Sequence, residues 1–255
     1  MTDLFSVSGK TVFISGGSRG IGAMLAEGFV NAGAKVIISA RKAAELHARC
    51  AHLQTLGDCT AIEADLSTQQ GVEALAAAIT SLTPRLGLDI LINNAGASWG
   101  ADIDSFPESG WDKVMNLNVK SVFFLSQQLL PLLKNAAAED RPARIINIAS
   151  VYGMVHSALK TYSYGASKAA VIQLTRQLAA DLAEAHINVN AIAPGYFPSD
   201  MTAPLDDQSL LQSIPLQRMG SADDIAGTAI FLASAASNYM TGSTLVLDGG
   251  IVASR

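Results

Sequence analysis

The sequence alternates between short apolar runs and longer segments with helical spacing along its whole length. Apolar strands joined by helical crossovers are typical of a parallel sheet that helices cover on both faces. Because such crossovers are right-handed, the pattern predicts a doubly wound α/β sheet. No linker or repeat interrupts it, so we expect one domain over residues 1–255. Strands are predicted at 10–15, 36–40, 60–64, 89–95, 143–149, 187–193 and 243–248, and helices at 20–32, 42–56, 68–82, 111–135, 162–185 and 223–235.

The composition argues against several classes of protein. Of the 255 residues, 49% are hydrophobic and 15% are charged, which is enough apolar material for a large core. The net charge is −5 and no basic stripe is present, so we expect neither nucleic acid nor a membrane surface as a partner. No apolar run approaches the ~18 residues of a membrane span, and no secretory signal is visible. We therefore expect a cytoplasmic protein with reduced thiols at Cys50 and Cys59 and, because its four histidines are scattered, no metal site.

A glycine-rich turn follows the first expected strand and opens the first expected helix. It reads Ser15-Gly-Gly-Ser-Arg-Gly-Ile-Gly22. A turn of this kind lets backbone amides approach a phosphate, and the N-terminus of the following helix favours the negative charge. A merely tight turn is the alternative, but the strand–turn–helix context favours a dinucleotide site.

The end of the second expected strand indicates which dinucleotide binds. An acidic residue there would hydrogen-bond the adenosine ribose of NAD, but the chain has Arg41 and Lys42, and its next carboxylate is Glu45. Arg19 in the glycine turn supplies a second guanidinium. Guanidinium groups bind phosphate through two parallel hydrogen bonds, so NADP(H) is favoured. The alternative is that Arg41 and Lys42 only begin a solvated helix.

Tyr164 and Lys168 are the candidate acid/base pair. They are four residues apart in an expected helix, which places them on one face, one turn apart. A phenol has an ordinary pKa near ~10, and a nearby ammonium group is expected to lower the pKa of Tyr164. The spacing alone is weak evidence, because two ordinary helix residues would give it as well.

These residues and several further motifs resemble the classical short-chain dehydrogenase/reductase family, essentially from end to end. The family's Asn-Asn-Ala-Gly motif is present as Asn93–Gly96. Its catalytic tetrad of Asn, Ser, Tyr and Lys matches Asn118, Ser150, Tyr164 and Lys168, with Asn116 as the alternative register for the first. The chain departs from the family in having Ser15 and Ser199 where Thr is usual. It also has one extra residue between Ser150 and Tyr164, which puts the substrate side of 151–161 in question.

The resemblance implies a Rossmann-type sheet of about seven strands in the order 3-2-1-4-5-6-7. It implies that Tyr164 protonates a carbonyl oxygen, that Ser150 hydrogen-bonds it, that Lys168 lowers the pKa of Tyr164, and that Asn118 holds a water. The implied cofactor-binding residues are Gly16, Ser18, Arg19, Gly20, Ile21, Gly22, Arg41, Asp65, Leu66, Asn94, Ala95, Gly96, Tyr164, Lys168, Pro194, Gly195, Phe197 and Ser199. The implied substrate-binding residues are Trp99, Ser150, Tyr164 and Tyr196.

Within the family, the chain is most similar to bacterial NADPH-dependent 3-oxoacyl reductases of the rhamnolipid-biosynthesis type, on the residues 97–101, 162–165 and 193–199. A substrate lid is expected at about 196–213, and apolar residues in it suit a hydrophobic ketone. An alcohol, polyol or steroid dehydrogenase is the alternative enzyme, and a non-catalytic dinucleotide sensor is the alternative class. Family members commonly pair through helices that correspond to 111–135 and 162–185, so a homotetramer or homodimer is expected.

Overall fold

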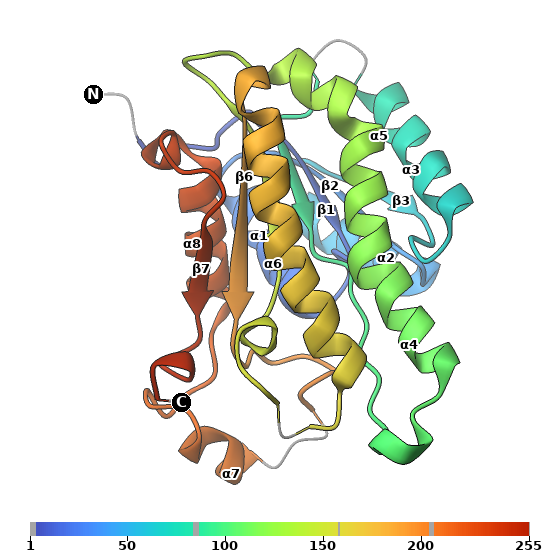
Figure 1. The fold of residues 1–255 in the computed structure, drawn as a ribbon. Coiled ribbons are helices and arrows are strands. Elements are labelled where there is room, and N and C mark those ends of the chain that lie inside the picture. The colour runs from blue at the N-terminus through green and yellow to red at the C-terminus, as the bar shows by residue number, and fades with distance from the viewer. Residues whose placement is uncertain (1–3, 84–86, 158, 204–206, 255) are drawn as a thin grey trace.

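A parallel sheet lies between two layers of helices in the computed structural model, which describes residues 4–83, 87–157, 159–203 and 207–254 (Figure 1). Among these residues seven strands pair in the order β3-β2-β1-β4-β5-β6-β7, so the predicted Rossmann-type topology is confirmed. The strands are β1 (Thr11–Ser15), β2 (Lys35–Ala40), β3 (Cys59–Glu63), β4 (Ile90–Asn93), β5 (Ala143–Ile148), β6 (Ile187–Pro194) and β7 (Thr244–Leu247).

The helices bury one apolar stripe each against the sheet. On β1, Val12 and Ile14 face one layer while Phe13 faces the other, as the alternation of a strand requires. One layer contains α1 (Gly20–Asn31), α2 (Ala43–Gln54) and α8 (Ala222–Ala233). The other contains α3 (Gln69–Leu82), α4 (Glu108–Met115), α5 (Ser121–Ala136) and α6 (Tyr162–Leu182), which stand in front of the sheet in Figure 1.

Two elements differ from the sequence prediction. The helix expected at 111–135 begins at Glu108, and a π-helical turn at Asn116–Lys120 separates α4 from α5. A π-bulge adds about one residue to a continuous helix, so the apolar spacing gave no sign of it. The expected lid contains a short helix, α7 (Asp207–Gln212), at the end of the sheet toward which the arrows of β6 and β7 point (Figure 1). Residues 204–206 of the lid lie outside the described part of the chain.

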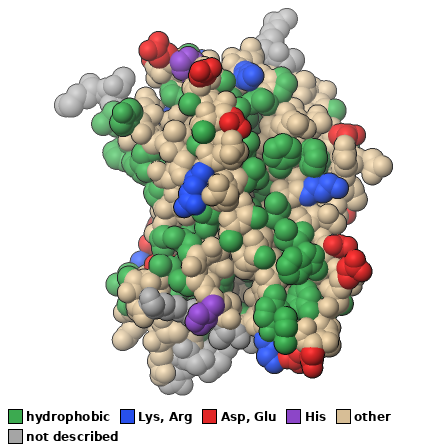
Figure 2. All heavy atoms as spheres, viewed as in Figure 1, with side chains coloured by type: hydrophobic (Ala, Val, Ile, Leu, Met, Phe, Trp, Pro, Cys, Tyr) green, Lys and Arg blue, Asp and Glu red, His purple; other side chains and the backbone are tan. Residues whose placement is uncertain are grey.

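The surface formed by α4 to α6 is rich in apolar side chains. Figure 2 shows hydrophobic side chains gathered over these helices with few charged ones among them. Trp111, Phe123 and Tyr162 are about two-fifths exposed there (42%, 38% and 41%). No described helix has the length and apolar character to cross a membrane.

Candidate active site

The glycine-rich turn between β1 and α1 adopts a shape that side chains would block. Gly16 and Gly20 have φ angles of +70° and +52°, which strongly favour glycine. A Cβ on Gly22 would lie 2.1 Å from the carbonyl oxygen of Gly16. Arg19, at the N-cap of α1, provides no side-chain cap for the first amides of the helix. The turn therefore presents a helix N-terminus to the solvent side, which fits the diphosphate of a dinucleotide.

Ser15 and Asn94 hold this turn against the loop that follows β4. The Ser15 hydroxyl accepts hydrogen bonds from the amides of Asn94 and Ala95, both at 3.0 Å. In return, the Asn94 amide group donates to the carbonyl oxygens of Ser15 at 2.8 Å and Gly16 at 3.1 Å. Serine in place of the family's threonine thus keeps the hydroxyl that the turn uses. Asn94, expected among the cofactor-binding residues, thus stabilises the glycine turn through these hydrogen bonds.

The two arginines expected to read a 2′-phosphate lie at the same edge of the sheet. Arg41 directly follows β2 and is exposed. Burial would raise the pKa of Asp65, but hydrogen bonds from Ser67 and, to a smaller extent, the charge of Arg41 hold it below its ordinary value. These hydrogen bonds come from the amide and hydroxyl of Ser67. Arg19 forms an exposed ion pair with Asp200, which links the glycine turn to the lid. An open hollow next to Arg19 is lined by Ser18, Arg19, Glu45, Ala48, Arg49, His52 and Asp200.

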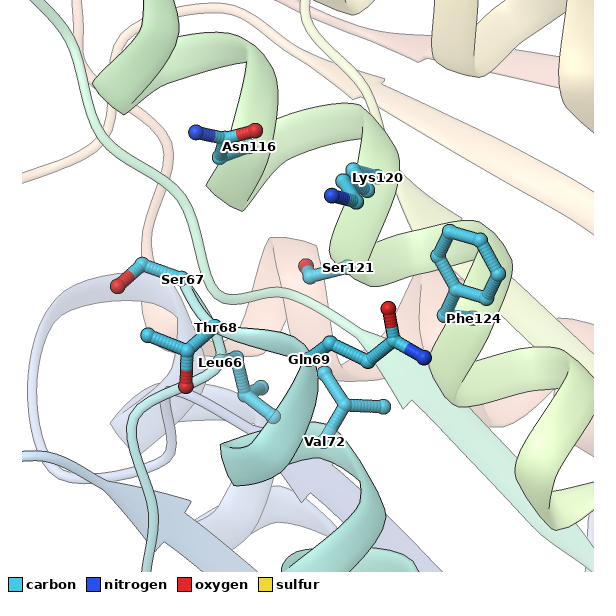
Figure 3. Close-up of a pocket in the computed structure, with 9 residues that line it drawn as sticks. All are labelled: Leu66, Ser67, Thr68, Gln69, Val72, Asn116, Lys120, Ser121 and Phe124. Carbon is cyan, nitrogen blue, oxygen red and sulfur yellow. The ribbon is translucent and has the colours of Figure 1, made fainter.

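Leu66, expected among the cofactor-binding residues, is 5% exposed and packs in the core beneath α3. Beside it, between the start of α3 and the π-helical turn, is a small hollow (Figure 3). Its free volume is about 10 Å³, which is room for about one water molecule. This hollow is therefore no site for a cofactor or substrate group, and any contact of Leu66 with a nucleotide would have to come from its backbone.

Ser150, Tyr164 and Lys168 converge at the carboxyl edge of the sheet. Ser150 follows β5 and is hydrogen-bonded to Tyr164, which lies in the first turn of α6. Lys168 lies one turn later, with its Nζ 5.6 Å from the centre of the Tyr164 ring. The same Nζ donates a hydrogen bond of 2.7 Å to the carbonyl oxygen of Ile148. The spacing argument from sequence therefore placed the pair correctly.

The expected electrostatics of the pair are wrong in this structure. Burial raises the pKa of Tyr164 above its ordinary value, while its hydrogen bond with Ser150 opposes the rise. Burial also lowers the pKa of Lys168 to about 8. In both cases the apolar surroundings disfavour the charged form and so shift the pKa toward the neutral one. The sequence showed the distance between the two groups but not their burial, which here outweighs the attraction of the ammonium for a phenolate.

Asn118 connects the loop after β4 to α6. It lies in the π-helical turn and is 1% exposed. Its amide oxygen accepts from the amide of Ala97 at 2.8 Å, and its amide nitrogen donates to the carbonyl of Ala97 at 2.9 Å and to the Ser167 hydroxyl at 2.9 Å. The side chain expected to hold a water thus hydrogen-bonds protein groups. The loop that Asn118 holds lies close to the Lys168 ammonium group, since a Cβ on Gly96 would be 3.7 Å from Lys168 Nζ.

Of the residues expected to bind the substrate, some lie at the site and others do not. Tyr196 reaches the site and shares a hydrogen bond with the hydroxyl of Tyr152. The Trp99 side chain instead packs against α4, where Lys113 Nζ lies 5.0 Å from the centre of its ring. Phe197, expected at the cofactor, is 3% exposed and packs against Gly220 in the core.

The start of the lid lies close to the glycine turn. A Cβ on Gly20 would be 3.3 Å from the Cβ of Ser199. Gly195, directly after β6, donates its amide to the carbonyl of Leu247 at 2.9 Å, and a Cβ there would be 2.9 Å from Asp248. Pro194 ends β6 immediately before it. The Pro-Gly motif therefore brings the lid to the same edge as the expected cofactor residues.

Two residues at the site were missed by sequence reasoning. Tyr152 is two positions after Ser150. Its hydrogen-bond partner, Tyr196, is 44 positions away, so no local sequence pattern indicates that the two residues meet. Ser167 lies within α6, and nothing in the sequence distinguishes it from an ordinary helix residue. Its hydroxyl donates a hydrogen bond of 2.7 Å to the Tyr164 carbonyl oxygen. Among the described residues, no group of three or more His, Cys, Asp or Glu side chains is arranged to hold a metal ion.

Residues 16–252 match a protein family whose model is described as enoyl-(acyl carrier protein) reductase. The chain is 51% identical to a rhamnolipids biosynthesis 3-oxoacyl-[acyl-carrier-protein] reductase of Pseudomonas aeruginosa, over 98% of this chain and 99% of that protein. It is 38% identical to a 2-dehydro-3-deoxy-D-gluconate 5-dehydrogenase of Escherichia coli, over 98% of each. The solved Pseudomonas aeruginosa RhlG/NADP active-site complex superimposes with a TM-score of 0.95 at 50% identity, covering 99% of this chain and 100% of that one.

Proposed function

Because this chain belongs to the short-chain dehydrogenase/reductase family, we propose that it is an NADPH-dependent carbonyl reductase whose substrate is a 3-oxoacyl thioester or a similar hydrophobic ketone. The observation that carries the proposal is the convergence of Ser150, Tyr164 and Lys168. Similarity to the Pseudomonas aeruginosa 3-oxoacyl reductase, and to a structure in complex with NADP, supports the substrate class and the cofactor.

The cofactor-binding residues follow from the shape of the turn. The amides around Gly16–Gly22 would hold the diphosphate, and Arg41 with Arg19 would bind the 2′-phosphate. The turn fits this use because only glycine fits at position 22, where a Cβ would overlap the Gly16 carbonyl, so α1 begins close against the turn. When bound, NADPH supplies the hydride that adds to the carbonyl carbon of the substrate.

The chain's own residues handle the oxygen and the proton. The hydroxyls of Ser150 and Tyr164 hydrogen-bond the carbonyl oxygen as negative charge develops on it. Tyr164 then gives that oxygen its proton. The phenol is protonated at neutral pH, and burial shifts its pKa further upward. Lys168, with a pKa of about 8, can return a proton to Tyr164 near neutral pH. Asn118 positions these groups by holding Ala97 and Ser167.

Two features favour a hydrophobic ketone over a sugar acid. Met154 and Leu159 lie in 151–161, Met201 lies in the expected lid, and all three are exposed (47%, 39% and 49%). Exposed apolar side chains next to a site suit an apolar ligand. The sequence from Tyr196 to Leu211 contains no Lys or Arg to bind a carboxylate. The second candidate, a keto-sugar-acid reductase, is favoured by similarity to several gluconate-type dehydrogenases, that of Escherichia coli among them.

A panel of substrates tests the proposal. NADPH oxidation is measured with acetoacetyl and longer 3-oxoacyl thioesters, cyclic ketones, keto sugars and keto sugar acids. We expect the highest kcat/KM with the 3-oxoacyl thioesters, rising about fourfold for each methylene group that becomes buried, because each contributes about 0.8 kcal/mol. A rate confined to keto sugars or their acids would contradict the proposal.

The arginine after β2 should decide the cofactor preference. Arg41→Asp removes a guanidinium and adds a like charge beside the 2′-phosphate, so we expect kcat/KM with NADPH to fall about 30-fold, or about 2 kcal/mol. The value with NADH should stay within about twofold, because NADH has no 2′-phosphate to lose a partner. Lys35→Asp makes the same charge change at the exposed start of β2 and is the matched control. An unchanged NADPH preference in Arg41→Asp would contradict the role given to this residue.

We further propose that residues 1–255 act as one cytoplasmic NADP-binding domain with a lid at 196–213. The homotetramer or homodimer expected from the resemblance stays a prediction. The exposed side chains of Trp111, Phe123 and Tyr162 support it, because they lie on the helices to which the resemblance assigns the interface.

A further inference from the structure

Two phenols that the proposed chemistry does not use lie beside the reacting hydroxyls. Tyr152 and Tyr196 share a hydrogen bond between their hydroxyl groups, and their rings meet edge to face with centroids 6.1 Å apart. Tyr152 follows β5 and Tyr196 follows β6, which are neighbouring strands of the sheet. The phenol pair, Tyr152 with Tyr196, is therefore at the carboxyl edge where ligands bind in sheets of this kind.

Tyr152 is held next to the reacting groups. Its amide donates a hydrogen bond of 3.2 Å to the Ser150 hydroxyl oxygen, and a Cβ on Gly165 would lie 3.1 Å from its carbonyl oxygen. Gly165 is the residue after Tyr164. After burial, which is the main cause, the proximity of Tyr152 also contributes to the raised pKa of Tyr164. The two contacts hold the backbone of Tyr152 against the Ser150 hydroxyl and the start of α6, and its effect on the pKa of Tyr164 indicates that the two phenols lie near each other.

Tyr196 is part of the expected lid, but its backbone is fixed. The amide of Gly195 donates to the carbonyl of Leu247, and the carbonyl of Tyr196 accepts from the amide of Gly220, both at 2.9 Å. The next side chain, Phe197, is 3% exposed in the core. Tyr196 is thus presented from a rigid segment, as a binding group needs to be.

We propose that the phenol pair binds the thioester carbonyl oxygen of a 3-oxoacyl substrate while Ser150 and Tyr164 bind its ketone oxygen. This inference rests on the proposed function and names the feature of the substrate that the site recognises. The two carbonyl carbons of a 3-oxoacyl thioester are separated by one methylene group, so the second oxygen has to find donors close to the first. Phenol hydroxyls both donate and accept, so a carbonyl oxygen can replace one hydroxyl as the partner of the other.

The chemistry of the pair also separates substrate classes. Phenols are uncharged donors at neutral pH and suit an uncharged carbonyl oxygen, whereas a carboxylate is bound best by Arg or Lys. A site built to hydrogen-bond a substrate oxygen discriminates against an analogue that lacks it, because the site's polar groups then lose a partner. The phenol pair would thus select β-dicarbonyl substrates over simple ketones.

The test uses Tyr152→Phe and Tyr196→Phe with two matched substrates. One is acetoacetyl-N-acetylcysteamine, and the other is its thioether analogue, in which a methylene group replaces the thioester carbonyl. Loss of one hydrogen bond should lower kcat/KM for the thioester about tenfold in each variant, mainly through KM. The value for the thioether should stay within about twofold of the wild type. Tyr162→Phe, which removes a phenol hydroxyl from the exposed face of the same helix as Tyr164, is the control and should change neither value.

Equal losses on both substrates in Tyr152→Phe and Tyr196→Phe would overturn the inference, because the pair would then only position Ser150 and Tyr164. Unchanged values on both would overturn it as well. The dissociation constant for NADPH and the melting temperature of each variant show whether a loss comes from misfolding. If one of the two variants misfolds, the other still tests the inference. Failure of the proposed function would look different, since the wild type itself would not turn over the thioester, and the inference would then fall with it.

Discussion

Replacing Tyr164 by Phe is expected to lower kcat for ketone reduction about 1,000-fold. The change removes the hydroxyl that is hydrogen-bonded to Ser150 and leaves the aromatic ring, so the proton donor is lost while the packing at the start of α6 is kept. The dissociation constant for NADPH should stay within about twofold, because the phosphate-binding turn between β1 and α1 is untouched. Steady-state kinetics and fluorescence titration with NADPH measure the two quantities.

Tyr162→Phe is the control for this prediction. Tyr162 lies two residues earlier in the same helix, and its ring contacts Phe106 with centroids 5.8 Å apart. Its hydroxyl has no role in the proposed chemistry, so this variant should retain full kcat. If Tyr164→Phe kept more than about a tenth of the wild-type kcat, Tyr164 would not be the proton donor, since general acid catalysis typically contributes at least a hundredfold.

The second large effect is on stability, and it concerns Lys168. Its side chain is 5% exposed, and burial lowers its pKa from 10.5 to about 8. A lysine that binds its proton less tightly in the folded state than in the unfolded state destabilises the fold at low pH. This cost is complete below pH 8 and is relieved as the pH rises from about 8 to 10.5, because each pH unit in that window returns about 1.4 kcal/mol.

Lys168→Met should therefore be more stable than the wild type at pH 7, and inactive. Methionine removes the charge, a gain of about 3 kcal/mol, but leaves the Ile148 carbonyl without its donor, a loss of about 1 kcal/mol. The net gain of about 2 kcal/mol in the free energy of unfolding should shrink as the pH approaches 10. Urea unfolding at pH 7 and pH 9.5 measures it, with the exposed Lys134→Met as the control. A Lys168→Met variant that is less stable than the wild type at pH 7 would contradict the cost given to this buried charge.

The parts of the fold that sequence reasoning predicted are those carried by local patterns. The alternation of apolar runs gave the elements, and the glycine turn with the family resemblance gave the strand order. Tyr164 and Lys168 could be paired because both belong to one helix, where spacing determines which residues share a face. Ser15 could be assigned a hydroxyl but not its partners, because Asn94 and Ala95 are brought to it by the pairing of β1 with β4.

The parts that were missed depend on contacts between distant segments. Arg144 appeared to be an ordinary residue at the start of a strand, but it is 1% exposed. Its guanidinium donates to the carbonyl oxygens of Leu232 and Ser234 at the end of α8 and to the side chain of Asn238. No sequence pattern near Arg144 could predict hydrogen-bond acceptors that are about 90 positions away. The pairing of Tyr152 with Tyr196 and the burial that reverses the expected pKa shift of Tyr164 were hidden for the same reason.

The central claim is that this site delivers a hydride to the ketone carbon of a 3-oxoacyl thioester. The most direct measurement is the reaction of the wild-type enzyme with acetoacetyl thioester and NADPH that carries deuterium at both positions of C4 of the nicotinamide, followed by mass spectrometry and NMR of the product. We predict a 3-hydroxybutyryl thioester with deuterium at C3 and an exchangeable proton on its oxygen. A product without deuterium at C3, or no hydroxyacyl product from any 3-oxoacyl thioester, would contradict the claim.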